Sequence, residues 1–180
     1  MGWRGDFQGD HGRSIMLRDR LSMLRSGGED VHPPSAAEGE GIVEHRLDRF
    51  VSAQDGVYED VLDELRAGRK SSHWMWFIFP QVAGLGSSGM AQRYAIRSLE
   101  EARAYLAHPV LGARLRDCAG LLLSIEGRSA EEVLGRIDAL KLQSSMTLFH
   151  RAAPQDPLFL EVLERYYDGV ADAATDALLA

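Results

Sequence analysis

The chain has 180 residues, of which 45% are hydrophobic and 26% charged, proportions typical of one globular domain of ordinary size. Its formal net charge of −7 argues against non-specific nucleic-acid binding, which needs a basic surface. No apolar stretch approaches the roughly 20 residues of a membrane-spanning helix, and the N-terminus lacks the apolar core of a secretory signal. The lone Cys118 excludes an intramolecular disulfide. We therefore expect a soluble cytoplasmic protein without membrane or nucleic-acid partners.

Residues 1–46 differ in composition from the rest of the chain. They hold eight of the 18 glycines and the pair Pro33-Pro34. A segment of this kind buries too little apolar surface to offset the entropy lost on ordering. The sequence predicts a flexible, disordered extension over residues 1–46 and a single helical domain over residues 47–180.

Helical periodicity dominates the domain. Apolar residues between positions 47 and 65 fall on one stripe, which predicts one helix ending near Gly68. Further helix starts are indicated by two capping boxes (Ser98 with Glu101, Ser129 with Glu132), by Pro109, by Asp138, and by the pair Asp156-Pro157. No alternating pattern of comparable strength indicates a strand. The predicted fold is all-α, a compact domain of about six or seven helices.

The run of residues 70–81 holds two of the three tryptophans and two of the six phenylalanines. Ser71 or Ser72 is placed to cap a short helix that Pro80 ends. The run is either a buried core segment or the aromatic floor of a small-molecule pocket. Both interpretations stay open, because residues that line a pocket can also pack in the core. In the second, Lys70, His73 and Gln81 form the rim.

Two other places carry polar residues where a helix interior is expected. Gln54 lies on the apolar stripe of the first helix, so its amide either bonds a loop backbone or faces a ligand. In the predicted helix 138–151, Asp138, Lys141 and Ser145 share one face. They form either a solvated ion pair beside a hydroxyl or, if the lysine is buried, a nucleophilic Ser–Lys pair.

The glycine-rich segment 82–89 precedes another predicted helix start, near Met90. Its spacing matches no nucleotide-binding loop, so a helix cap at Ser87 or Ser88 is favoured over a phosphate site.

Together these segments resemble a mostly bacterial, all-helical family of unknown function that is sometimes labelled calpastatin-like. The matching residues are 47–50, 53–54, 58, 65, 68, 70, 72–81, 84–86, 88, 94–96, 101–102, 105–106, 109, 111–112, 114–115, 138, 141–142 and 144–149, within a region of roughly 47–170. The resemblance implies a compact all-α fold and the cytoplasm, but no established reaction. The calpastatin label implies a protease inhibitor, which disagrees with a folded domain. The helix containing Gln54, the turn after Pro109 and Asp138 are also similar to helical glycosidase-like proteins that act on ADP-ribose derivatives.

Two functions follow as hypotheses. The first is a hydrolase acting on an N-glycosidic bond of a nucleotide or ADP-ribose-like substrate, and the second is a non-catalytic module that binds a metabolite or a protein. The candidate catalytic residues are His73, Asp138 and Lys141. The candidate ligand-binding residues are Gln54, Lys70, Ser72, Trp74, Trp76, Gln81, Ser144 and Ser145. The pattern indicates no metal and no cofactor.

Overall fold

The computed structural model describes residues 46–180. Over this range the chain is helical, with an isolated parallel β-bridge between Val82 and Ile96. The helices are α1 (Asp48–Gln54), α2 (Tyr58–Arg66), α3 (Met75–Ile78), α4 (Gly89–Arg93), α5 (Leu99–Ala107), α6 (Leu111–Ser124), α7 (Ala130–Leu134), α8 (Arg136–Ala152), α9 (Leu158–Tyr167) and α10 (Ala173–Leu179). The all-α prediction is confirmed for the described region, but it contains ten helices rather than six or seven. The extension predicted for residues 1–46 lies outside the described residues, except for Arg46.

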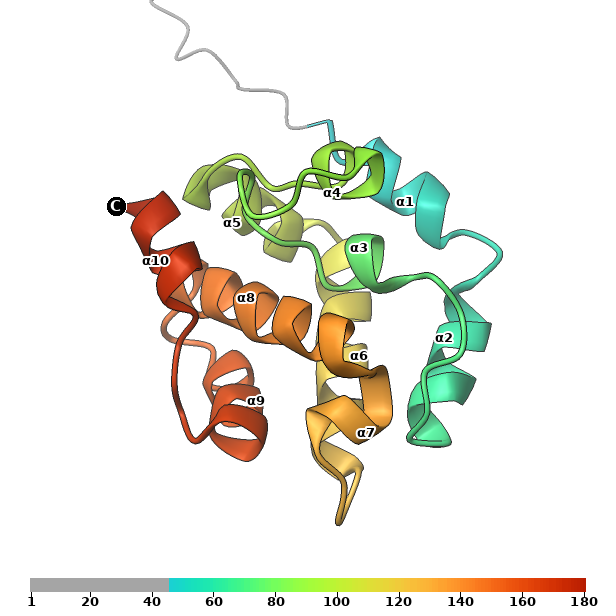
Figure 1. The fold of residues 1–180 in the computed structure, drawn as a ribbon. Coiled ribbons are helices and arrows are strands. Elements are labelled where there is room, and N and C mark those ends of the chain that lie inside the picture. The colour runs from blue at the N-terminus through green and yellow to red at the C-terminus, as the bar shows by residue number, and fades with distance from the viewer. Residues whose placement is uncertain (1–45) are drawn as a thin grey trace, which may run out of the picture. The chain divides into compact units, whose positions relative to one another are not determined.

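Helix α8 is the centre of the domain. It packs against α5, α7, α9 and α10, and Figure 1 shows it crossing the middle of the described region. Its sequence explains this position, because nine of its 17 residues are buried, more than one helical face can hold. None of the helices in residues 46–180 is long and apolar enough to cross a membrane.

A row of aromatic rings runs through the core and joins four helices. Phe50 of α1 packs edge-on against Tyr105 of α5, with ring centroids 5.1 Å apart. Tyr105 contacts Phe149 of α8 at 5.4 Å, and Phe149 contacts Phe159 of α9 at 5.7 Å. Such pairs add directional preference to the burial of large apolar surfaces. The row therefore fixes how α1, α5, α8 and α9 pack around one another.

The single helix predicted for residues 47–65 is wrong, because it is divided into α1 and α2. Asp55 adopts an extended conformation after Gln54, and Gly56 follows with φ of 81°. This left-handed conformation is one that glycine adopts at little cost. Gly68, with φ of 63°, follows α2 as the predicted stop.

The predicted cap of the aromatic run is also wrong. Helix α3 is preceded by Trp74, and no side chain from residues 46–180 caps it. The backbone N–H groups of Ser71 and Ser72 instead donate to Oε2 of Glu64, at 2.7 and 3.2 Å. A carboxylate on α2 thus accepts hydrogen bonds from the backbone N–H groups of the loop that leads into α3.

The capping predictions differ in outcome along the rest of the chain. The box of Ser129 and Glu132 is formed as predicted, and Ser88 caps α4. Ser98 accepts from the N–H of Glu101, but the Glu101 carboxylate binds Arg49 and the N–H of Arg97, so only half of that box forms. At Asp138 the prediction is wrong. Gly135 occupies the N-cap position of α8, and Asp138 lies within the first turn.

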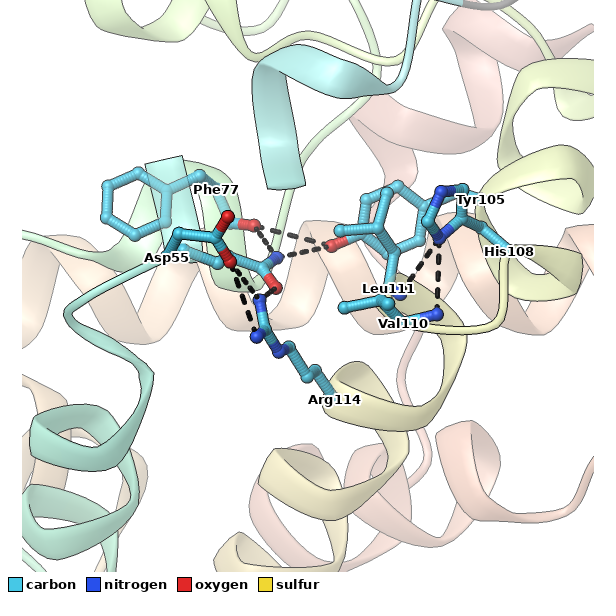
Figure 2. Close-up of polar contacts among 8 residues, drawn as sticks. Asp55, Phe77, Tyr105, His108, Val110, Leu111 and Arg114 are labelled. Carbon is cyan, nitrogen blue, oxygen red and sulfur yellow. Dashed lines mark hydrogen bonds and ion pairs between the residues drawn. The ribbon is translucent and has the colours of Figure 1, made fainter. Parts of the chain in front are cut away.

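Helix α6 also begins differently from the prediction. Pro109 was expected at the first helical position, whereas α6 starts at Leu111. The Nδ1 atom of His108 accepts from the N–H groups of Val110 and Leu111, at 3.2 and 3.3 Å, as Figure 2 shows. The imidazole thus satisfies backbone donors that a helix N-terminus leaves free.

Candidate functional site: a cationic hollow at the start of helix α8

Asp138 binds two lysines at once. Its Oδ2 lies 2.6 Å from Nζ of Lys70, and its Oδ1 lies 2.7 Å from Nζ of Lys141, one helical turn further along α8. The Lys70 ammonium also donates to the carbonyl of Ser72 at 2.7 Å, and the Lys70 backbone N–H donates to Val133 at 2.8 Å. The predicted pair of Asp138 and Lys141 is therefore present, and Lys70 completes a cluster between two parts of the chain.

The protonation state of Asp138 follows from this cluster. Partial burial alone raises the pKa of the carboxyl, but the hydrogen bonds from Lys141 and Lys70 outweigh it and lower the pKa below its ordinary value. The group is therefore a carboxylate at neutral pH. All three side chains are largely shielded, with exposed fractions of 9% for Lys70, 16% for Asp138 and 17% for Lys141.

The two tryptophans of the aromatic run occupy different environments. Trp74 is 1% exposed and donates its indole N–H to Oε2 of Glu64 at 2.8 Å, so it belongs to the core. Trp76 is only partly buried. The Lys141 ammonium lies 4.1 Å from the centroid of the Trp76 ring, within cation–π range. Trp76 is thus the tryptophan that a ligand could reach, and one of its faces is already in contact with Lys141.

These side chains surround an open hollow of about 530 Å³, which we call the cationic hollow. It is lined by Lys70, His73, Trp76, Leu134, Gly135, Arg136, Ile137, Asp138 and Lys141. Three cationic side chains against one carboxylate leave an excess of two positive charges, without counting His73. Arg136 forms no ion pair with the residues that the structure describes. The hollow therefore combines positive charge with an aromatic wall.

Gln54 lies elsewhere, in the buried interior. Its amide nitrogen donates to the carbonyl of Phe77 at 2.8 Å and to the Tyr105 hydroxyl at 3.1 Å, and its oxygen accepts from Arg114 at 3.3 Å. Figure 2 shows Phe77, Tyr105 and Arg114 converging from three elements, with Asp55 bonded to the guanidinium. Of the two interpretations of Gln54, the structure shows a bond to backbone, but the carbonyl belongs to Phe77 of helix α3 and not to a loop.

The remaining predicted site residues lie at different places in and around the cationic hollow. His73 is exposed and lines the cationic hollow, and Gln81 and Ser144 line a neighbouring hollow. Ser72 reaches the cluster through its backbone carbonyl. Ser145 is fully buried, and its hydroxyl has no hydrogen-bond partner among the described residues. It lines neither hollow, so the structure does not present it as a nucleophile.

Sequence reasoning missed Arg136, Ile137 and Glu64. Ile137 is 70% exposed and lines the cationic hollow with Arg136, while Glu64 anchors the loop that carries Lys70 and His73. Three hydrogen bonds to its carboxylate hold Glu64 in its charged form. Its limited burial raises the pKa, but hydrogen bonds from Ser71, Ser72 and Trp74 lower it to about 2. The sequence Gly135-Arg136-Ile137 gives no signal for this turn, because the exposure of Ile137 is visible only in the structure.

The fold and the hollow define an all-helical domain with a ligand-sized, positively charged surface depression. The chain belongs to the family described as "Protein of unknown function (DUF1810)", whose model matches residues 44–179. It is similar to the crystal structure of the conserved hypothetical protein Rv1873 from Mycobacterium tuberculosis. The two share 58% identity and a TM-score of 0.73, over 74% of this chain and 95% of that one. A search of curated proteins gave no match. The calpastatin-like label and the likeness to ADP-ribose glycosidases find no support in these comparisons.

Proposed function

We propose that the protein binds a small organic anion in the cationic hollow. The observation that carries the proposal is the excess of Lys70, Arg136 and Lys141 over Asp138 beside the partly exposed Trp76. Small-molecule sites combine apolar or aromatic walls with a few placed polar groups, and a volume of about 530 Å³ falls within their ordinary range. The net charge of the whole chain is negative, so this local excess of positive charge is a property of the hollow itself.

The start of α8 supports the same proposal. No side chain in the described part of the chain caps this 17-residue helix, and Gly135, Arg136 and Ile137 at its N-terminus line the hollow. The N–H groups of a first helical turn carry partial positive charge and lack intrahelical partners. An anion in the hollow therefore meets backbone donors as well as the cationic side chains.

Binding is favoured over hydrolysis by the state of Asp138. Its lowered pKa leaves no proton to donate at neutral pH, and both of its oxygens already accept from ammonium groups, which weakens it as a base. One observation keeps the hydrolase as a second candidate: the imidazole of His73 lines the same hollow. Product release from ADP-ribose that is abolished in His73→Gln would favour the enzyme. A cytoplasmic location is part of the proposal.

Isothermal titration with inorganic pyrophosphate at low ionic strength tests the binding proposal. Arg136→Ala removes an exposed charge of the hollow, so we expect the Kd to rise about tenfold, equivalent to the loss of one charge-assisted contact. Arg66→Ala is the matched control, because Arg66 is also exposed and, among residues 46–180, forms an ion pair only with Asp63 on its own helix. Absence of binding by the unmodified protein, or equal weakening by both variants, would contradict the proposal.

A further inference from the structure

A second hollow adjoins the cationic hollow. It has a volume of about 510 Å³ and lies where α3, the glycine-rich segment, α4, α8 and the start of α10 meet. Its lining residues are Trp76, Gln81, Leu85, Gly86, Ser87, Ser88, Ala91, Ile137, Leu140, Lys141, Ser144, Asp172 and Ala174. Three of these, namely Trp76, Ile137 and Lys141, also line the cationic hollow. A single ligand that crosses this shared ridge therefore reaches both hollows.

The second hollow differs in charge from the first. Its one cation, Lys141, belongs to the shared ridge, and Asp172 also lines the hollow, so the formal charges of its lining residues sum to zero. Much of its remaining lining is apolar, and two large side chains there face solvent, Ile137 at 70% and Leu140 at 60% exposure. These two adjoining side chains give a bound molecule an apolar surface to cover. The second hollow thus suits an uncharged, flat or apolar body rather than another anion.

Two polar side chains in the second hollow have atoms that could form hydrogen bonds with a ligand. The Oδ2 atom of Asp172 accepts from Ser144, from the N–H of Thr175 and from the Thr175 hydroxyl, at 3.0, 3.0 and 2.6 Å. Its Oδ1 atom and the side-chain amide of Gln81 form no hydrogen bond with other described residues. A free carboxylate oxygen accepts from hydroxyl or amino groups, and an amide both donates and accepts. These groups match a sugar or a heterocyclic base.

We infer that the ligand is a nucleoside diphosphate that crosses the ridge of Trp76 and Lys141. The phosphates lie in the cationic hollow against Arg136 and Lys141, and the nucleoside lies in the second hollow. There its base covers Ile137 and Leu140, and its hydroxyl or amino groups donate to Oδ1 of Asp172. This inference rests on the proposed function and names the substrate class of that same site. The division of charge between two adjoining hollows is what distinguishes it from the binding of a simple anion.

The test compares two probes, ADP and inorganic pyrophosphate, by isothermal titration. Ala174→Trp fills the second hollow from an exposed position of α10 that does not line the cationic hollow. Ala177→Trp is the matched control, because it places the same side chain at another exposed position of α10 that lines neither hollow. We expect Ala174→Trp to weaken ADP at least about tenfold while pyrophosphate affinity stays within about twofold, and Ala177→Trp to change neither.

The possible outcomes distinguish failure of the nucleoside placement from failure of the proposed anion site. Equal affinity of ADP for Ala174→Trp and for the unmodified protein, with pyrophosphate still binding, overturns the nucleoside placement and leaves the proposed anion site standing. Failure of the unmodified protein to bind either probe overturns both. Retained pyrophosphate binding shows that Ala174→Trp is folded. If it does not fold, Leu140→Gln replaces it, because Leu140 is exposed and lines only the second hollow. The same selective loss of ADP affinity is expected, and its absence overturns the inference.

Discussion

The ammonium of Lys70 lies 2.6 Å from Oδ2 of Asp138, and this contact joins the loop after α2 to the first turn of α8. The backbone N–H of Lys70 reinforces it by donating to Val133, the residue before the end of α7. The loop is therefore tied at two points beside the cationic hollow. Because His73 and Trp76 follow on the same segment, the tie also fixes one wall of the hollow relative to α8.

Replacing Asp138 by Asn should separate a structural role from a catalytic one. The change leaves Lys70 and Lys141 without a negative partner, and we expect a loss of about 2 kcal/mol, between the values for exposed and buried pairs. Pyrophosphate should bind at least about threefold tighter, because one opposing charge is removed from the hollow. Urea unfolding and titration measure the two effects. Weaker binding by a folded Asp138→Asn protein would assign the carboxylate a direct role toward the ligand.

Glu64 gives stability a specific pH dependence. Its pKa in the folded protein is about 2, below the ordinary value of 4.5, so its contribution is complete above about pH 5 and disappears as the pH falls through 4.5 towards 2. We expect Glu64→Gln to cost about 1–3 kcal/mol at pH 7 through weakened bonds to Ser71, Ser72 and Trp74. The difference between the two proteins should shrink at pH 3. A constant difference over that range would show that the charge is unimportant.

Gln54 should matter for stability but not for binding. In Gln54→Leu the carbonyl of Phe77 keeps only the Tyr105 hydroxyl at 3.3 Å, and Arg114 loses an acceptor. Because these groups are buried or partly buried, we expect a loss of about 2–3 kcal/mol in unfolding experiments. Pyrophosphate affinity should not change, since Gln54 lines neither hollow. A selective loss of binding would restore the alternative in which this amide faces a ligand.

Substitution of two glycines of α6 by Ala should change the stability of the protein in opposite directions. A Cβ atom at Gly112 would lie 2.1 Å from the carbonyl oxygen of Leu106, whereas a Cβ atom at Gly120 would have no atom of another described segment within 4 Å. Gly112→Ala should therefore destabilise the protein by at least about 1–3 kcal/mol, because backbone must move. Gly120→Ala should stabilise it by about 0.5–1 kcal/mol through helix propensity. Thermal unfolding of both variants checks the close packing between the end of α5 and the start of α6.

The two tryptophans should respond differently to truncation. Trp74→Ala empties a core position that is 1% exposed and also removes a donor to Glu64, so we expect a loss of about 3–5 kcal/mol. Trp76→Ala removes a partly exposed ring and its contact with Lys141, so the loss should be below about 2 kcal/mol, with weaker ADP binding. Equal stability of the two variants, measured by urea unfolding, would contradict this assignment.

Short-range features of the structure were predictable because their partners are close in sequence. The box of Ser129 and Glu132 and the ion pair of Asp138 and Lys141 each join residues three apart, a spacing that helical geometry fixes. The same reasoning failed for the region 47–65. There the apolar stripe is compatible with one helix, but the residues form two. The chain turns at Gly56, and the spacing of apolar residues does not show where the backbone changes direction.

Contacts between distant segments were not predictable from the residues alone. Lys70 and Asp138 were both candidates, yet nothing in either sequence neighbourhood specifies that they pair. Ser71 and Ser72 were expected to cap α3, but Glu64 supplies a stronger, charged acceptor from another helix. Gln54 was correctly recognised as unusual on an apolar stripe, while its partner, the carbonyl of Phe77, depends on how α1 packs against α3. Tertiary packing decided each of these cases.

The contrast between Trp74 and Trp76 makes the protein's own fluorescence a reporter of its surface. Trp74, sealed in the core, should emit at short wavelength and resist quenching by acrylamide. Trp76 lies on the ridge between the two hollows and should be accessible to the quencher. Trp3, which lies outside the described residues, is removed from the spectrum by Trp3→Phe. In the Trp3→Phe protein, a molecule bound in either hollow should protect Trp76 from acrylamide and leave the quenching of Trp74 unchanged. Binding can therefore be measured without an added label.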